Sequence, residues 1–163
     1  MIHRLRVADL LRAHVRGRPE HRSGRRDPLA RYARLLASLD LRPDDRESIF
    51  EEEKLDEARF EELSSAWDAA IEKELSRHRN KLLRDQDAAY VAKLEEERAP
   101  IAASDYARMA AAAEINALGP VMTDLHLPMA AWPRIRRVWI QLVARDRKLA
   151  ALVQSFLDEE RSK

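Results

Sequence analysis

Apolar residues recur three and four residues apart along most of this chain, and this helical periodicity is the feature that most restricts its fold. No stretch alternates β-branched or aromatic residues with polar ones, as a half-buried strand does. Alanine, leucine, arginine and glutamate, which favour helices, dominate the sequence. We therefore predict an all-α protein, and 163 residues are enough for one domain with its own core.

Two segments centred on Trp67 and Trp139 match each other position by position. Each has an aromatic residue seven positions earlier and an aliphatic residue four positions earlier, and a Tyr-Ala-Arg tripeptide lies further upstream of each. We predict two tandem copies of a unit with a period of about 72 residues, made of a Tyr helix, a loop and a Trp helix, packed as a small helical bundle. The predicted core residues are Tyr32, Phe60, Leu63 and Trp67 in the first copy and Tyr106, Trp132, Ile135 and Trp139 in the second.

Helix start and stop signals divide the chain into three parts. Residues 1–26 form a predicted basic helical arm and linker, 27–98 the first helical unit, and 99–163 the second. Asp27 followed by Pro28, and Asp56, are predicted N-caps.

The sequence leaves two helix boundaries open. Residues 56–98 form either one long helix or two helices with a break near 77–80. The last helix, 130–160, either continues as a coiled-coil-like seam or bends where Asp146 caps a fresh turn.

Charge is segregated along the chain although its net value is only +1. The arm carries eight arginines against two acids, whereas residues 44–62 carry ten acids against three bases. Such asymmetry indicates an interaction tail or an internal docking pair. Because Leu5, Leu10 and Leu11 of the arm share an apolar stripe, we expect it to dock into an apolar groove with an acidic rim, near Ile49 and Phe50, either of its own chain or of a second copy.

Catalytic and metal-binding motifs are missing from the sequence. The chain has no cysteine and three glycines, which excludes disulfide frameworks, thiolate sites and glycine-rich phosphate loops. Its five histidines do not have the spacing of zincin or di-iron motifs. We therefore predict no enzymatic activity, no cofactor and no metal.

These observations favour a cytoplasmic protein without a membrane span that binds another protein or a second copy of itself, as an adaptor, chaperone or assembly subunit, such as one that handles secreted or effector proteins. The alternative is a nucleic-acid-binding protein that uses the arm and an Arg134–Lys148 face. The pattern around Trp67 and Trp139 resembles Trp-anchored helical segments of bacterial proteins. This resemblance does not assign a role to any residue. The predicted partner-binding residues are Leu5, Leu10, Leu11, Arg12, Leu83, Tyr90 and Leu94.

Overall fold

The computed structural model describes residues 27–162, and every regular element in that range is a helix, which confirms the all-α prediction. The predicted arm, with Leu5, Leu10, Leu11 and Arg12, lies outside the described residues. The α-helices are α2 (Pro28–Leu41), α3 (Arg46–Glu53), α4 (Glu57–Leu75), α5 (Lys81–Glu97), α6 (Ala103–Glu114), α7 (Leu118–Asp124), α8 (Trp132–Arg145) and α9 (Arg147–Arg161), and two 3₁₀ turns are η1 (Pro43–Asp45) and η2 (Met129–Ala131).

Aspartate side chains begin three of the helices. Asp27 accepts a hydrogen bond from the Leu29 N–H at 2.9 Å, with Pro28 in the first helical position, and Asp56 accepts from the Arg59 N–H at 2.8 Å. Asp146 accepts from the N–H of Leu149 at 3.1 Å and separates α8 from α9. The caps predicted at Asp27 and Asp56 are thus confirmed, and the interpretation of 130–160 as one continuous helix is wrong.

The chain between 56 and 98 is also broken into two helices. Helix α4 ends at Leu75 and α5 begins at Lys81, and His78 between them has a left-handed φ of 57°. Residues 76–81 contain no apolar side chain that would hold a continuous helix against a core. The carboxylate of Glu74 accepts a hydrogen bond from the Leu82 N–H at 2.6 Å, which secures the start of α5 after the turn.

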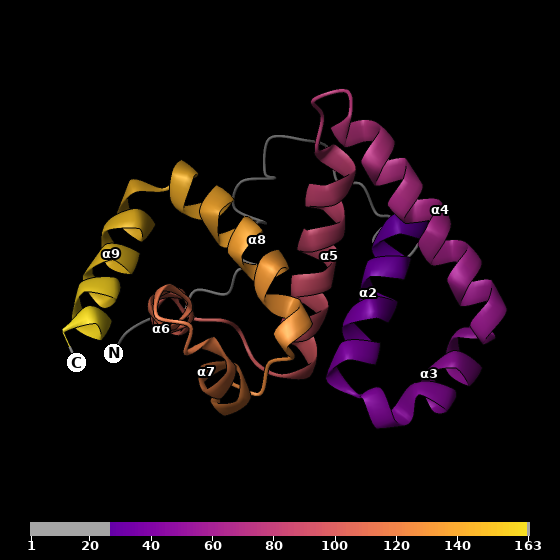
Figure 1. Ribbon diagram of the computed structural model, residues 1–163, viewed down its shortest axis with the longest axis horizontal. Coiled ribbons are helices and arrows are strands. Elements are labelled where there is room, and N and C mark those ends of the chain that lie inside the picture. The colour runs from indigo at the N-terminus through magenta and orange to yellow at the C-terminus, as the bar shows by residue number, and fades with distance from the viewer. Residues whose placement is uncertain (1–26, 163) are drawn as a thin grey trace.

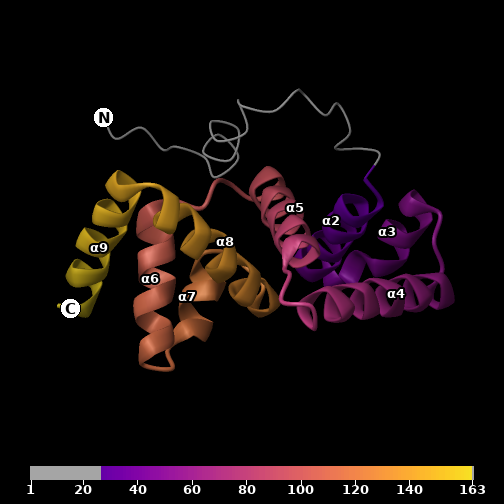
Figure 2. The same cartoon turned by 90° about the horizontal axis from the view of Figure 1, so that it is seen from above.

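The helices form two halves, α2–α5 and α6–α9, which meet where α5 lies against α8 (Figure 1, Figure 2). In the first half α2 packs along α5, and in the second α6 packs along α9.

The turns at Lys54 and at His126, 72 residues later, have similar backbone geometry. Lys54 and His126 have left-handed φ values of 55° and 53°. The N–H of Leu55 donates to the Phe50 carbonyl at 2.9 Å, and the N–H of Leu127 donates to the Met122 carbonyl at 2.8 Å. Helix order and turn geometry therefore recur, whereas the derivation of both halves from one repeated unit stays a prediction.

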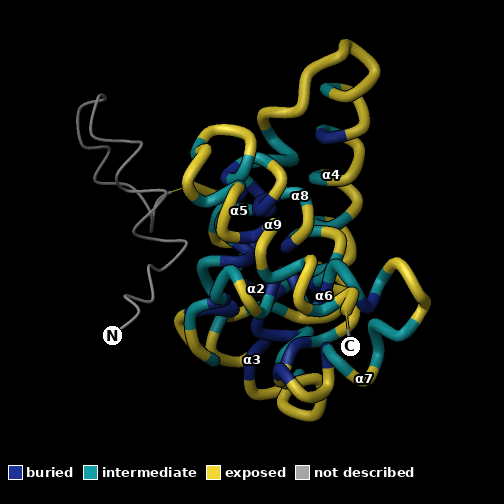
Figure 3. Tube along the Cα trace, turned by 90° about the vertical axis from the view of Figure 1, so that its left-hand side faces the viewer, coloured by how far each residue is buried: buried dark blue, intermediate teal, exposed yellow. Residues whose placement is uncertain are grey.

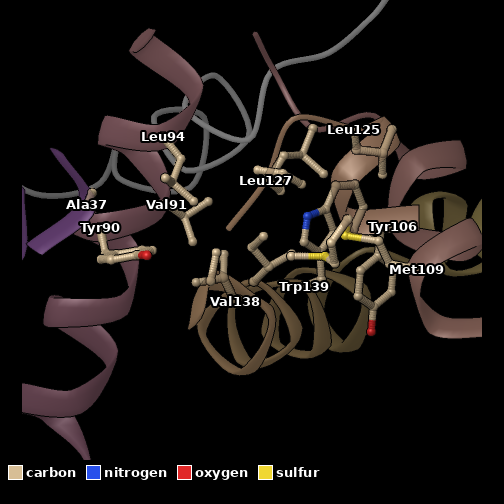
Figure 4. Close-up of a cluster of buried hydrophobic side chains, with 14 of the residues drawn as sticks. Ala37, Tyr90, Val91, Leu94, Tyr106, Met109, Leu125, Leu127, Val138 and Trp139 are labelled. Atoms are coloured by element: carbon tan, nitrogen blue, oxygen red, sulfur yellow. The ribbon is translucent and has the colours of Figure 1, made fainter. Parts of the chain in front are cut away.

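The main core lies in the second half and extends to α5 and α2 (Figure 4). Trp139 is 1% exposed and stacks on Tyr106, with ring centroids 4.9 Å apart, and the Tyr106 ring also lies 6.1 Å from that of Trp132. Ile135 is fully buried beside them. Aromatic stacking of this kind adds to the stabilisation that comes from the buried apolar area.

Tyr90 and Leu94 are fully buried in this core, so the prediction that they lie uncovered for a partner is wrong. The break after α4 turns α5 back between α2 and α8, and these helices cover its apolar face. Leu83, one turn from the start of α5, is half-buried.

Helix α4 packs less tightly than its counterpart α8. Ile71 is its one buried residue, and most of its trace in Figure 3 is exposed or half-buried. Trp67, Phe60 and Leu63 are half-buried, while Tyr32 beneath them is buried, with its ring 6.4 Å from that of Phe60. The two tryptophans therefore occupy matching places in the sequence but differ in burial.

This difference predicts unequal losses of stability. Trp139→Ala should lower the free energy of unfolding by about 3–5 kcal/mol, as truncation of a buried aromatic does. Trp67→Ala should cost clearly less, because part of its ring already contacts water. Thermal and urea unfolding of both variants checks the prediction, and equal losses would contradict it.

One ion pair joins the two halves, with a buried carboxylate and an arginine that is 40% exposed. The side chain of Asp87 on α5 is 1% exposed and accepts two hydrogen bonds from Arg137 on α8, at 2.6 Å from Nε and 2.8 Å from Nη2. Next to it the guanidinium of Arg134 lies 4.5 Å from the centre of the Tyr90 ring, and the Tyr90 hydroxyl donates to Asp40 on α2. Burial raises the pKa of Tyr90 far above its usual value, so this hydroxyl stays protonated.

We expect Arg137→Met to destabilise the protein by roughly 1–3 kcal/mol, because it leaves the buried Asp87 carboxylate without its partner at a place that water can reach beside the 40% exposed Arg137. Adding Asp87→Val should restore most of the lost stability. Arg161→Met is the matched control, since its pair with Glu114 is about half exposed and exposed pairs contribute about 0–1 kcal/mol. Urea unfolding of the three variants measures these differences, and an Arg137→Met loss no larger than the control loss would contradict the prediction.

Candidate binding pocket

A pocket of about 500 Å³ opens in the first half, between the start of α2, the turn that joins α3 to α4, and the first turns of α4. Its volume is in the range of sites that take a small ligand or a few side chains. The residues that line it are Asp27, Pro28, Arg31, Tyr32, Leu35, Glu53, Lys54, Leu55, Arg59 and Leu63.

The floor of the pocket is apolar. Tyr32 and Leu35 of α2 are buried, and Leu55 and Leu63 are half-buried around the opening. The Tyr32 hydroxyl donates a hydrogen bond to Oγ of Ser64 at 2.9 Å. Burial raises the pKa of Tyr32, which keeps this hydroxyl neutral. The floor therefore suits an apolar side chain rather than a charged one.

The charged residues of the lining divide into paired and unpaired groups. Asp27 is engaged as the α2 cap, and Glu53 accepts two hydrogen bonds from Arg31, at 2.9 Å from Nε and 2.8 Å from Nη2. Lys54 and Arg59 have no ion-pair or hydrogen-bond partner for their side chains among residues 27–162. Two unpaired cations thus stand at the mouth of an apolar pocket.

The matching place in the second half is closed. The residues 72 positions after Leu55, Arg59 and Leu63 are all buried in the main core: Leu127, Ala131 and Ile135. Fully buried Ile101, just before the Ala102 N-cap of α6, belongs to the same cluster.

Hydrogen bonds hold this entering segment in place. The N–H of Ile101 donates to Glu95 at 2.9 Å, and Nε of Arg98 donates to the carbonyl of Leu125 in the turn after α7. The chain that enters α6 therefore covers the second-half site.

The two halves differ in residue type at two key positions. Ile101 stands five residues before Tyr106, whereas exposed Asp27 stands five residues before Tyr32. Buried Ala131 stands 72 positions after exposed Arg59. A charged residue at either position does not fill an apolar floor, which is a physical reason for the first-half pocket to stay open within the described residues.

The residues that the sequence analysis named lie in two different places in the structure, the pocket and the main core. Tyr32 and Leu63, predicted as core, line the pocket, whereas Tyr90 and Leu94 lie inside the main core. The sequence did not indicate Lys54 or Arg59, and a comparison of Arg59 with Ala131, 72 positions later, is the signal that identifies Arg59.

Among residues 27–162, Ile49 and Phe50 do not line the open groove that was expected beside them. Both side chains are buried against Leu35 and Leu39 of α2, at 3% and 7% exposure. Of the ten acids in 44–62, one, Glu53, lines the pocket. The apolar surface open to a partner in this region is therefore the pocket.

The arginines of α8 do not share one face. Arg134 and Arg137 point to α5, where they contact Tyr90 and Asp87. Arg136 and Arg145 are exposed but nine residues apart, which places them on opposite sides of the helix. The expected Arg134–Lys148 face is thus split, and two of its cations are engaged inside the protein.

Within the described residues no cluster of His, Asp and Glu is arranged to hold a metal ion. None of the helices from α2 to α9 has the length and apolar character that crossing a membrane requires. Comparisons with protein-family models, curated proteins and solved structures found no match.

Proposed function

We propose that this protein is a non-enzymatic protein-interaction module, an adaptor, chaperone or assembly subunit, that binds its partner through the first-half pocket. The observation that carries the proposal is the contrast between the halves: Tyr32, Leu55 and Leu63 line an open pocket, whereas the matching second-half residues form a closed core. An open apolar floor with a polar mouth is typical of sites that receive side chains from another chain.

The proposal includes the tandem unit predicted from the sequence. Equal helix order and the matching turns at Lys54 and His126 support a duplicated unit. In this interpretation the second copy supplies a closed core, to which α5 is fixed by the Asp87–Arg137 pair. The first copy keeps the pocket and the loosely packed α4, and it is the copy that binds.

Nucleic-acid binding is the weaker alternative. Arg134 and Arg137 are occupied by contacts to α5, so the described cations do not form a continuous surface for a phosphate backbone. The excess of acids over bases in 44–62, ten against three, opposes the approach of a polyanion to this region.

A filled pocket tests the proposal. We expect Leu63→Trp to occupy the pocket volume and to reduce recovery of the partner at least about tenfold in affinity capture from the native host, read by quantitative mass spectrometry. Ala69→Trp on the same helix is the matched control, since Ala69 is exposed and does not line the pocket. Thermal unfolding establishes that both variants are folded.

The same experiment separates the alternatives. A protein that the parent and Ala69→Trp recover, that Leu63→Trp loses, and that binds the purified parent directly supports the proposal. Concentration-dependent sedimentation that Leu63→Trp abolishes identifies the partner as a second copy. Equal recovery by all three proteins, or recovery of nucleic acid alone, contradicts it.

A further inference from the structure

We infer that the first-half pocket binds an extended segment of a partner protein in which an aliphatic residue stands beside a single carboxylate. The aliphatic side chain packs on the floor formed by Tyr32 and Leu35, and the carboxylate pairs with Lys54 and Arg59 at the mouth. This inference deepens the proposed function and rests on it for the role of the pocket in partner binding.

The second half shows what kind of group fills the comparable place. Residues 98–102, which are not helical, lead into α6, and Ala102 at their end has extended φ and ψ of −78° and 162°. One of their side chains, Ile101, is fully buried in the main core, and its N–H donates to Glu95 at 2.9 Å. A short extended stretch of chain with one aliphatic side chain is therefore the occupant that this arrangement of helices accepts, which favours a protein segment over a free small molecule.

The floor of the first-half pocket requires the same kind of side chain. Tyr32 and Leu35 are buried, and the Tyr32 hydroxyl already donates to Ser64, so the floor has no free polar group for a ligand. Asp27, at the place that corresponds to Ile101, is exposed and accepts hydrogen bonds from the first N–H groups of α2. It therefore leaves the floor open to an aliphatic side chain from another chain.

The charges of the lining determine what stands beside that aliphatic side chain. The lining holds three cations, Arg31, Lys54 and Arg59, against two carboxylates, Asp27 and Glu53. Both carboxylates are engaged, because Asp27 caps α2 and Glu53 accepts from Nη2 of Arg31 at 2.8 Å. Lys54 and Arg59 are exposed, and neither side chain has an ion-pair or hydrogen-bond partner among residues 27–162. The mouth therefore has positive charge that only a ligand can pair.

Arg59 separates the ligand of this pocket from the segment that fills the second half. It stands 72 positions before Ala131, which is fully buried in the main core, so a cation replaces a methyl group at this place. A carboxylate complements both an arginine and a lysine at the rim of an apolar site, because it accepts charge-assisted hydrogen bonds from each. The ligand therefore resembles the segment around Ile101 with one acidic residue added.

Acids outside the lining limit the ligand to one carboxylate. Glu51 and Glu52 on α3 and Glu61 and Glu62 on α4 are exposed, and none of the four lines the pocket. A carboxylate in contact with Lys54 and Arg59 gains from direct pairing, whereas exposed charges beyond a Debye length of about 8 Å are largely screened. A run of acids would extend past the two cations toward these glutamates and be repelled. The segment is therefore neutral or basic outside its one acidic residue.

Selection from a phage-displayed library of random dodecapeptides on the purified full-length protein tests the inference. The enriched peptides should share an aliphatic residue with Asp or Glu beside it, and Leu63→Trp should lose this enrichment while Ala69→Trp keeps it. Fluorescence anisotropy then measures the affinity of a synthetic peptide with the enriched sequence. Replacement of its acid by the amide should weaken binding about fivefold, as for exposed ion pairs, and replacement of its aliphatic residue by serine at least about tenfold.

A charge exchange tests the place of the carboxylate. Lys54→Glu combined with Arg59→Glu should reverse the selection, so that the enriched peptides carry Lys or Arg beside the aliphatic residue. Lys73→Glu combined with Arg77→Glu is the matched control, since these exposed residues give the same change in net charge and do not line the pocket. Thermal unfolding establishes that both double variants are folded. A reversed preference requires that the acid lies near Lys54 and Arg59, and a general loss of stability does not produce it.

Several results would overturn the inference. These are enriched peptides without an acid, no enrichment above that of Leu63→Trp, and an unchanged preference after the charge exchange. Concentration-dependent sedimentation that Leu63→Trp abolishes also overturns it, because a second copy then occupies the pocket. If the captured partner is lost by Leu63→Trp but kept by the Lys54→Glu and Arg59→Glu variant, the proposed function stands and the inference fails. If the peptides behave as expected but no captured partner depends on Leu63, the peptide chemistry stands and the proposed function fails.

Discussion

The relation of the two halves depends on the contact of α5 with α8, where a shared apolar core and the Asp87–Arg137 pair lie side by side. A carboxylate that is 1% exposed is tolerated because Arg137 donates two hydrogen bonds to it. Replacement of such a pair by apolar residues often leaves stability unchanged. The pair therefore chiefly orients α8 relative to α5. It requires α8 to cross α5 in one register, which also sets Arg134 over Tyr90.

Local signals in the sequence identified most helix boundaries, because each depends on a few neighbouring residues. Asp27, Asp56 and Asp146 cap helices through their own side chains, and the polar run at 76–81 breaks one. The closed second-half core was also predictable, since Trp132, Ile135 and Trp139 follow one another at helical spacing. Local chemistry determines all of these features.

Long-range contacts were not predictable from periodicity. An apolar stripe shows that a face is covered but not what covers it, so Tyr90 and Leu94 were mistaken for a free surface. Asp87 looks like any acid on a helix until Arg137, 50 positions later, is placed beside it. Likewise, Arg134 and Arg137 read as parts of a basic face, because a sequence does not show which arginines have internal partners.

The pocket is a third kind of feature, because it depends on which residues stand at comparable places in the two halves. In the second half, Ile101 and Ala131 are buried together with Leu127 and Ile135. In the first half, exposed Arg59 stands 72 positions before Ala131, and burial of an arginine without a partner would cost several kcal/mol. An open site at this place takes nothing from the packing of the second half, because no residue that lines the pocket belongs to the main core.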